Sequence, residues 1–121
     1  MQFPALPAIP HPLQFKSVTF TALQPGPKLI VLGAVHGNEV SGSKAILKMI
    51  QEFEIGDRLL VKGQVTFVPI TNPLAYNRKQ RNGDRNLNRN LTPTNNPTDF
   101  EDHVANWLCP LLAAHDVLLD I

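Results

Sequence analysis

The stretch that decides the fold is KLIVLGAVHGNEVSG, Lys28 to Gly42. Its first eight residues (28–35) form a continuous apolar, β-branched run, which is typical of a buried strand. Directly after it, from Glu39 to about Phe53, apolar residues recur at helical spacing. We therefore expect a strand that leads into a helix through the short junction HGNE. Such junctions commonly hold the active sites of α/β proteins.

Further strands are expected on both sides of this unit. The segment SVTFTAL (17–23) alternates and is β-branched, and PGP (25–27) should turn the chain, so we expect a hairpin before the buried strand. The helix should end at Gly56-Asp57, and QVTFVPI (64–70) should be the next strand. The apolar face of the helix is expected to comprise Val40, Ile46, Leu47, Ile50 and Phe53.

The C-terminal third predicts another helix and another strand. TDFE (98–101) has the form of a capping box, and helical periodicity continues to Leu112, although Pro110 should kink or shorten this helix. DVLLDI (116–121) indicates a further buried strand. This order of elements predicts an α/β sandwich with at least partly parallel strands.

Composition limits the classes of partner. The 121 residues are 43% hydrophobic, which is enough for one globular core. Lys and Arg number 11 against 10 Asp and Glu, so no long-range field favours nucleic acid or an anionic membrane. We expect a small-molecule partner, and the sequence is compatible with a homo-oligomer. The single cysteine, Cys109, fits a reducing compartment and is expected to be a small buried hydrophobe, not a catalytic thiol.

The N-terminal residues 1–16 contain four prolines, which predicts an extended, polyproline-like arm and argues against a secretory signal. No apolar run reaches the ~18 residues needed to span a bilayer. We therefore divide the chain into an arm, residues 1–16, and a domain, residues 17–121, and expect a cytoplasmic protein.

The junction HGNE carries the strongest chemical signal. His36 should leave the strand on a tight turn and Glu39 should enter the first helical turn, so that an imidazole and a carboxylate converge on one point. Zinc takes these two ligand types together, commonly with a third protein ligand and a water in catalytic sites. The alternative is an ordinary loop histidine beside a glutamate favoured by the helix dipole.

A second polar cluster follows the strand 64–70. TNPLAYNRKQRNGDRNLNRN (71–90) is rich in arginine and amides, and its guanidinium groups could bind a carboxylate bidentately. A solvated loop is the alternative. A nucleic-acid site is disfavoured because Tyr76 is the only aromatic residue in the cluster.

Together these segments resemble the succinylglutamate desuccinylase/aspartoacylase family, relatives of the zinc carboxypeptidases. The match runs from the strand before Gly33 to Asp120-Ile121. HGNE resembles the segment that supplies the family's first two zinc ligands. The family's Asn-Pro, Arg and Asp-Leu-Asn-Arg motifs are matched in order and spacing by Asn72-Pro73, Arg81 and Leu87-Asn88-Arg89.

The resemblance implies a three-layer α/β/α mixed sheet of the zinc carboxypeptidase-like type. It also implies a deacylase that hydrolyses the amide of an N-acyl amino acid such as N-succinylglutamate or N-acetylaspartate. One Zn²⁺ would be bound by His36 and Glu39, Arg81 would help to stabilise the oxyanion, and Asn88 and Arg89 would bind a substrate carboxylate.

Two departures from the family pattern affect these expectations. Asn86 stands where the family has Asp, which removes a negative charge beside the arginines. The family's third zinc ligand, a His just after a strand like LLDI, and its general-base Glu would lie beyond Ile121. We therefore expect a truncated N-terminal part of the catalytic domain, which binds zinc weakly and has no activity alone.

The other histidines are not expected to replace the missing ligand. His103 should be a partly buried helix residue, His115 should close that helix, and His11 belongs to the arm. Two other functions are open: a non-catalytic anion- or phosphate-binding α/β module that uses residues 33–42, or an inactive family member. The first lacks both G-x-G-x-x-G and G-K-[ST].

Overall fold

The structure is a computed structural model and describes residues 11–121, so most of the predicted arm lies outside the described residues. The described chain alternates strands and helices. In order, the elements are β1 (Val18–Thr21), β2 (Gln24–Leu32), α1 (Val40–Glu54), β3 (Lys62–Val68), α2 (Pro73–Asn77), α3 (Phe100–Ala113) and β4 (Val117–Asp120).

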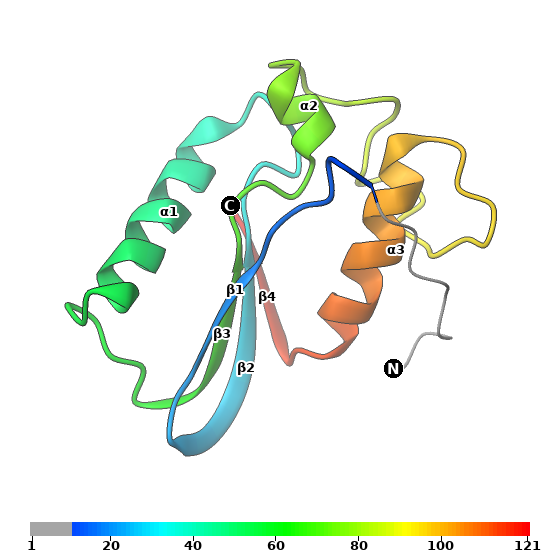
Figure 1. Ribbon diagram of the computed structural model, residues 1–121. Helices are drawn as coiled ribbons and strands as arrows, with labels where there is room; N and C mark the ends of the chain where they lie inside the picture. The colour runs from blue at the N-terminus through cyan, green and yellow to red at the C-terminus, as the bar shows by residue number, and fades with distance from the viewer. Residues whose placement is uncertain (1–10) are drawn as a thin grey trace.

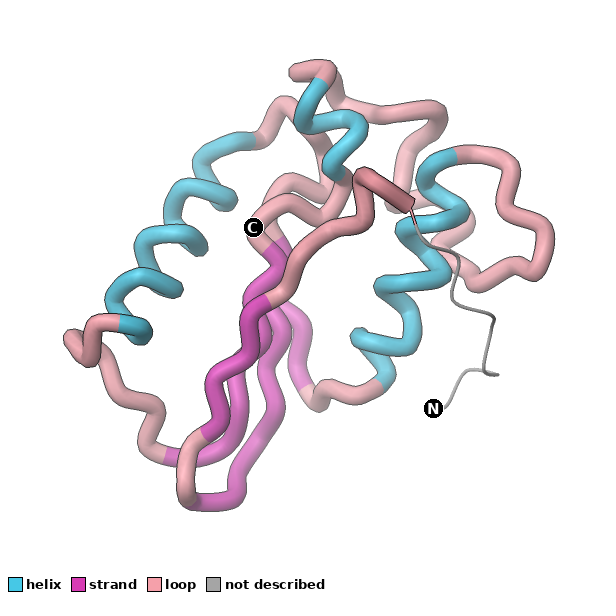
Figure 2. Tube along the Cα trace, viewed as in Figure 1, coloured by secondary structure: helices cyan, strands magenta, loops and turns pink. Residues whose placement is uncertain are grey.

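The strands form one mixed sheet in the order β1-β3-β2-β4. The central strand β2 runs parallel to β3 and β4, whereas β1 runs antiparallel to β3. Helices α1 and α3 lie on opposite sides of the sheet (Figures 1 and 2). The predicted three-layer α/β/α mixed sheet is thereby confirmed.

Two hydrophobic cores lie on the two faces of the sheet. Along β2, Ile30 and Leu32 join the core that packs against α3, whereas Val31 joins the core under α1. This alternation follows from the two-residue period of a strand. The α3 core is completed by Val35, Val68, Leu87, Phe100, Val104 and Leu108, and the α1 core by Ile46, Ile50, Val65 and Phe67. Burial on both faces explains why β2 is apolar throughout its second half.

The expected hairpin is wrong. Strand β1 does not pair with β2, because β3 lies between them. Pro25 and Pro27 lie inside β2, where the pairing with β3 changes register between Gln24 and Lys28. Proline lacks a backbone N–H and is tolerated in a strand where the ladder is irregular.

Helix α1 begins one residue later than expected. Glu39 is its N-cap residue and does not lie within the first turn. Ile46 and Ile50 are buried as expected, but Val40 is 39% and Leu47 50% exposed, so the buried face is narrower than the sequence pattern suggested.

The C-terminal half differs in four details. Helix α2 was not predicted; it begins at Pro73, and the Asn72 side chain accepts a hydrogen bond from the backbone N–H of its third residue, Ala75. The capping box of α3 involves Asp99 and Asp102 instead of Thr98 and Glu101. Helix α3 continues through Pro110 to Ala113, and β4 is half exposed because it is an edge strand. None of the helices within residues 11–121 has the length and apolar character needed to cross a bilayer.

Candidate active site

The backbone at the end of β2 fixes the start of the junction HGNE. Hydrogen bonds continue past Leu32: the N–H of Thr71 donates to the Gly33 carbonyl at 2.9 Å, and that of Asn72 donates to the Ala34 carbonyl at 3.1 Å. Ala34 has a φ of 48°, an uncommon left-handed conformation for a residue other than glycine. The junction therefore leaves the sheet at the carboxyl ends of β2 and β3.

Gly37 holds this junction tightly against α2 and the following loop. A Cβ atom at this position would lie 2.3 Å from the Ala75 carbonyl oxygen and 2.4 Å from that of Gln80. The Gly37 N–H also donates to the Arg81 carbonyl at 3.1 Å. Only glycine leaves room for this close approach, which joins the junction to the arginine-rich segment 78–90 (the arginine loop).

The His36 side chain is the centre of the candidate site. It is 7% exposed, and its Nδ1 atom lies 2.8 Å from Glu39 Oε1. Its Nε2 atom lies 3.1 Å from Asn86 Oδ1, which also accepts the backbone N–H of Asn88 at 3.0 Å. The structure thus brings together the two predicted ligands and adds Asn86 from the arginine loop.

The partners of His36 define the roles of its two nitrogens. A backbone N–H can only donate, so the Asn86 atom between Asn88 and His36 must be the amide oxygen. Nε2 of His36 therefore carries a proton and donates to it. Nδ1 faces the Glu39 carboxylate. Both groups have lone pairs, so a proton or a metal cation between them would be bound by both.

Asp120 lies at the end of β4, within electrostatic reach of this pair. Partial burial raises the pKa of the Asp120 carboxyl group; the negative charge of Glu39 raises it further, and His36 acts in the opposite direction. The carboxyl ends of β2 and β4 therefore meet at the same place, as expected for neighbouring parallel strands.

The junction HGNE contains two of the side-chain types that commonly bind zinc. Imidazole nitrogen and carboxylate oxygen suit zinc, and Nδ1 of His36 and Oε1 of Glu39 lie side by side. Among residues 11–121, no group of three or more His, Cys, Asp or Glu side chains could hold a metal ion. The two ligands fit one part of a catalytic zinc site, which normally has three protein ligands.

The predicted oxyanion-stabilising residue and the two predicted substrate-binding residues all lie in the arginine loop. Arg81, Asn88 and Arg89 are exposed. Arg81 contacts the junction through its carbonyl group, and Asn88 contacts Asn86 through its backbone N–H. No described contact directs the side chains of these three residues toward His36, so their roles remain predictions.

The Arg85 side chain is only 20% exposed and folds back against the protein. Its guanidinium group donates to Asp102 Oδ1 at 2.8 Å and to the Asn86 carbonyl at 3.2 Å, and it also bonds to the Arg89 carbonyl. Asp102 lies in the first turn of α3 and takes part in its capping box with Asp99, so Arg85 ties the arginine loop to the start of that helix. The loop is therefore partly folded against α3.

Two other histidines have structural contacts. Nδ1 of His115 lies 2.6 Å from the Leu111 carbonyl and Nε2 lies 2.8 Å from Thr66 Oγ1, which links the end of α3 to the sheet. His103 packs between His11 and Trp107, with ring centroids 5.3 and 5.9 Å away. Both lie in the α3 layer.

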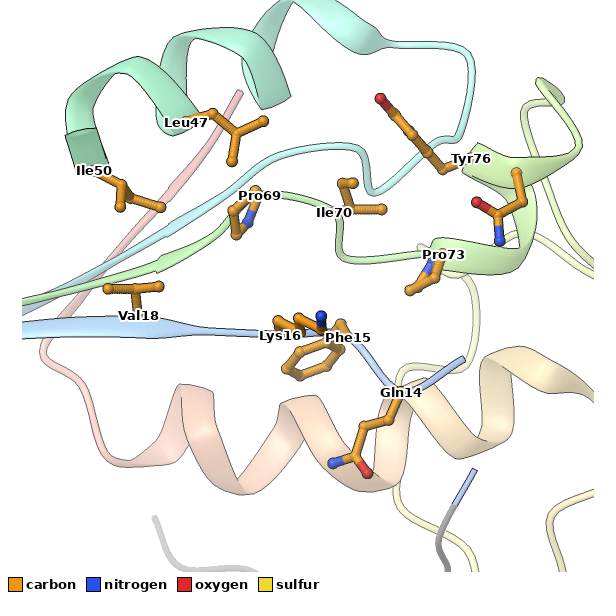
Figure 3. Close-up of a pocket in the computed structure, with 11 residues that line it drawn as sticks. Gln14, Phe15, Lys16, Val18, Leu47, Ile50, Pro69, Ile70, Pro73 and Tyr76 are labelled. Atoms are coloured by element: carbon orange, nitrogen blue, oxygen red, sulfur yellow. The ribbon is translucent and has the colours of Figure 1, made fainter. Parts of the chain in front are cut away.

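A cavity of about 410 Å³ lies beside α1 and α2 (Figure 3). Its walls are mainly apolar and include Phe15, Leu47, Ile70 and Tyr76. None of the five predicted site residues lines it. The candidate site at His36 is therefore separate from this cavity.

Sequence reasoning missed two residues of the site region. Asn86 was recognised as a departure from the family motif, but its hydrogen bond to His36 was not foreseen. Glu101 was assigned to a capping box, yet it is fully buried and contacts the backbone of the arginine loop. A glutamate among the apolar positions of a helical pattern was the available signal.

The chain is similar to known proteins over most of its length. The family model "Succinylglutamate desuccinylase/Aspartoacylase catalytic domain" matches residues 25–117. A curated relative from Prochlorococcus marinus, named "Probable aspartoacylase", is 35% identical over 81 residues. The aligned segment covers 67% of this chain and 26% of the relative, so the chain spans about a quarter of that protein's length.

Solved structures show the same fold. An aspartoacylase family protein from Mesorhizobium loti has a TM-score of 0.78 and 25% identity, over 88% of this chain and 34% of its own. The product-bound ectoine utilization protein EutE from Ruegeria pomeroyi has a TM-score of 0.73 and 25% identity, over 86% of this chain and 32% of its own. With the family model covering most of its length, including the junction and the arginine loop, the chain belongs to the succinylglutamate desuccinylase/aspartoacylase family.

Proposed function

We propose that the complete protein containing this chain is a zinc-dependent deacylase that hydrolyses an N-acyl amino acid, such as N-succinylglutamate or N-acetylaspartate. The observation that carries the proposal is the arrangement around His36. Asn86 holds the Nε2 proton, so that Nδ1 faces Glu39 where a metal ion would be bound. Membership of the family and the aspartoacylase relative support the substrate class.

In this proposal His36 and Glu39 bind one Zn²⁺ ion. Zinc, when bound, lowers the pKa of a coordinated water and polarises the scissile carbonyl. Arg81 helps to stabilise the developing oxyanion, and Asn88 and Arg89 bind the substrate carboxylate by hydrogen bonds and ion pairing. Binding at the carboxylate orients the amide next to the metal ligands. We also propose a cytoplasmic location, with which the free, buried Cys109 thiol agrees.

An anion-binding module is the weaker proposal. Phosphate commonly binds to the exposed N–H groups at a helix N-terminus. At the start of α1, however, an anion would meet the Glu39 carboxylate, whose side chain is 59% exposed. This negative charge favours a cation at the same position.

The test uses the complete protein. Zinc content and the hydrolysis of N-acetylaspartate and N-succinylglutamate are measured before and after chelation, and again after zinc is added back. We expect chelation to abolish turnover and zinc to restore it. Zinc-loaded protein that hydrolyses neither these nor other N-acyl amino acids would instead indicate an inactive family member.

Substitutions with matched controls test the role proposed for each residue. Glu39→Gln should lower zinc affinity at least tenfold, whereas Glu54→Gln, an exposed change at the far end of the same helix, should leave it unchanged. Arg89→Ala should mainly raise KM and Arg81→Ala should mainly lower kcat, each by about one to two decades. Lys79→Ala is the control from the same loop. If kcat and KM stayed within twofold of the wild-type values in both arginine variants, the roles proposed for Arg81 and Arg89 would be contradicted.

A further inference from the structure

Glu101 is the most deeply buried charged residue in the described chain. Its exposed fraction is 0%, and it lies in the first turn of α3. An isolated buried carboxylate is costly, so its partners must compensate for the water it has lost. Within residues 11–121, no Lys, Arg or His forms a salt bridge with it.

Hydrogen-bond donors take the place of a cation. Oε2 accepts Nδ2 of Asn72 at 2.7 Å and the N–H of Gly83 at 2.9 Å. Oε1 accepts the N–H groups of Asp84 and Arg85, each at 3.0 Å. All four partners are donors, so both oxygens serve as acceptors, as in an ionised carboxylate. The positive end of the α3 dipole adds to this stabilisation.

These four bonds join two segments of the candidate site. Asn72 follows β3, and its backbone N–H is bonded to the Ala34 carbonyl just before the junction HGNE. The three N–H groups belong to residues 83–85, and the next residue is Asn86, whose oxygen accepts the Nε2 proton of His36. One carboxylate therefore fixes the backbone on both sides of the His36 imidazole.

We propose that Glu101 is a positioning residue: by holding Asn72 and the backbone of residues 83–85, it sets the position of Asn86 and thereby the orientation of His36. Its carboxylate contacts neither of the predicted metal ligands, so its effect passes through the loop. The link to zinc binding rests on the proposed function, whereas the link to the loop and to His36 does not.

The informative substitution is Glu101→Gln, which keeps the shape of the side chain. The amide retains one oxygen and presents an NH₂ group to donors that need an acceptor, so about two of the four bonds are lost. Thr66→Val is the matched control. This change is also isosteric, and Thr66 is buried and makes two hydrogen bonds. Its partners, Thr19 in β1 and His115 after α3, lie outside the two segments that Glu101 joins.

Two measurements on the complete, metal-free protein test the proposal. Hydrogen exchange reports the amides of residues 83–85, and ¹⁵N-histidine NMR reports which nitrogen of His36 carries the proton. We expect Glu101→Gln to speed exchange at residues 83–85 at least tenfold more than Thr66→Val does, and to reduce the Nε2–H form of His36. Unchanged exchange at 83–85, or an unchanged His36 spectrum, would overturn the proposal.

Zinc affinity, measured by chelator competition, should fall about tenfold in Glu101→Gln and stay near wild type in Thr66→Val. If Glu101→Gln does not fold, Glu101→Asp is measured instead. We expect the same faster exchange at residues 83–85, because the shorter carboxylate cannot reach both segments. If the wild-type protein hydrolyses no N-acyl amino acid while Glu101→Gln still shows the exchange and NMR effects, the proposed function is refuted and the positioning role stands.

Discussion

The His36 imidazole receives its two partners from different parts of the chain. Glu39 follows it by three residues, whereas Asn86 reaches it from the arginine loop. The first contact follows from local geometry, because a tight turn into a helix brings residues i and i+3 together. The second depends on how the loop packs against α3, and no spacing rule contains that information. The proximity of His36 and Glu39 could therefore be predicted from the sequence, but the contact between His36 and Asn86 could not.

Asn86→Asp should strengthen zinc binding in the complete protein. A carboxylate at this position would still accept Nε2–H of His36 and the N–H of Asn88, and its charge would make the imidazole a better ligand. We expect an increase in zinc affinity of about tenfold, measured by competition with a chromogenic chelator. Asn86→Leu, similar in size and unable to accept either bond, should lower the affinity. Equal affinities for the two variants would exclude a role for Asn86 in orienting His36.

At the scale of elements, the first turn of α3 carries two acidic residues with different tasks. Asp102 Oδ2 accepts the N–H groups of Thr98 and Asp99, and Oδ1 accepts Arg85. Glu101, next to it, turns inward to the loop. The sequence correctly predicted a capped helix here. The pattern assigned Glu101 to the cap in place of Asp102, because the burial that distinguishes the two residues arises only when the loop is in place.

Asp102 should stabilise the folded protein at neutral pH and lose this effect at acid pH. Burial alone would raise the pKa of this carboxyl group, but hydrogen bonds from Thr98, Arg85 and Asp99 outweigh it and hold the pKa well below its usual range. A carboxyl group whose pKa is lowered on folding stabilises the protein above its unfolded pKa, near 4. That contribution is lost progressively as the pH falls below about 4.

Urea unfolding of the wild type and Asp102→Asn at pH 7 and pH 3 measures this effect. We expect the variant to be less stable by about 1 kcal/mol at pH 7, the usual size of a helix cap, and the difference to shrink at pH 3. A difference that is the same at both pH values would show that the charge of Asp102 has no part in it.

Elsewhere in the fold, the elements with strong periodicity were predicted and those set by tertiary contacts were not. Strands β2 and β3 and helices α1 and α3 follow their apolar patterns to within a few residues. The pairing of β1 with β3 was missed because the choice of neighbour depends on which strands occupy the sheet centre. Helix α2 is too short for a periodic signal, and only Asn72-Pro73 marks its start.

For the whole molecule, the number of candidate zinc ligands limits the activity that we expect of the 121 residues alone. The described part offers His36 and Glu39, fewer protein ligands than catalytic zinc sites usually have. We expect the 121-residue polypeptide to bind zinc at least a hundredfold more weakly than the complete protein and to hydrolyse no N-acyl amino acid. Calorimetric zinc titration and an activity assay check this. Turnover that a chelator abolishes would contradict it.

Strand β4 also affects how such a polypeptide behaves at high concentration. Among residues 11–121 it pairs only with β2, and Val117, Leu118 and Leu119 are each about half exposed. An open strand edge with apolar side chains is a template for pairing between molecules. The solubility of the isolated polypeptide should therefore be limited by strand-to-strand association at this flank. Lysine substitutions on β4, or a peptide that adds a neighbouring strand, are the rational means of keeping it monomeric.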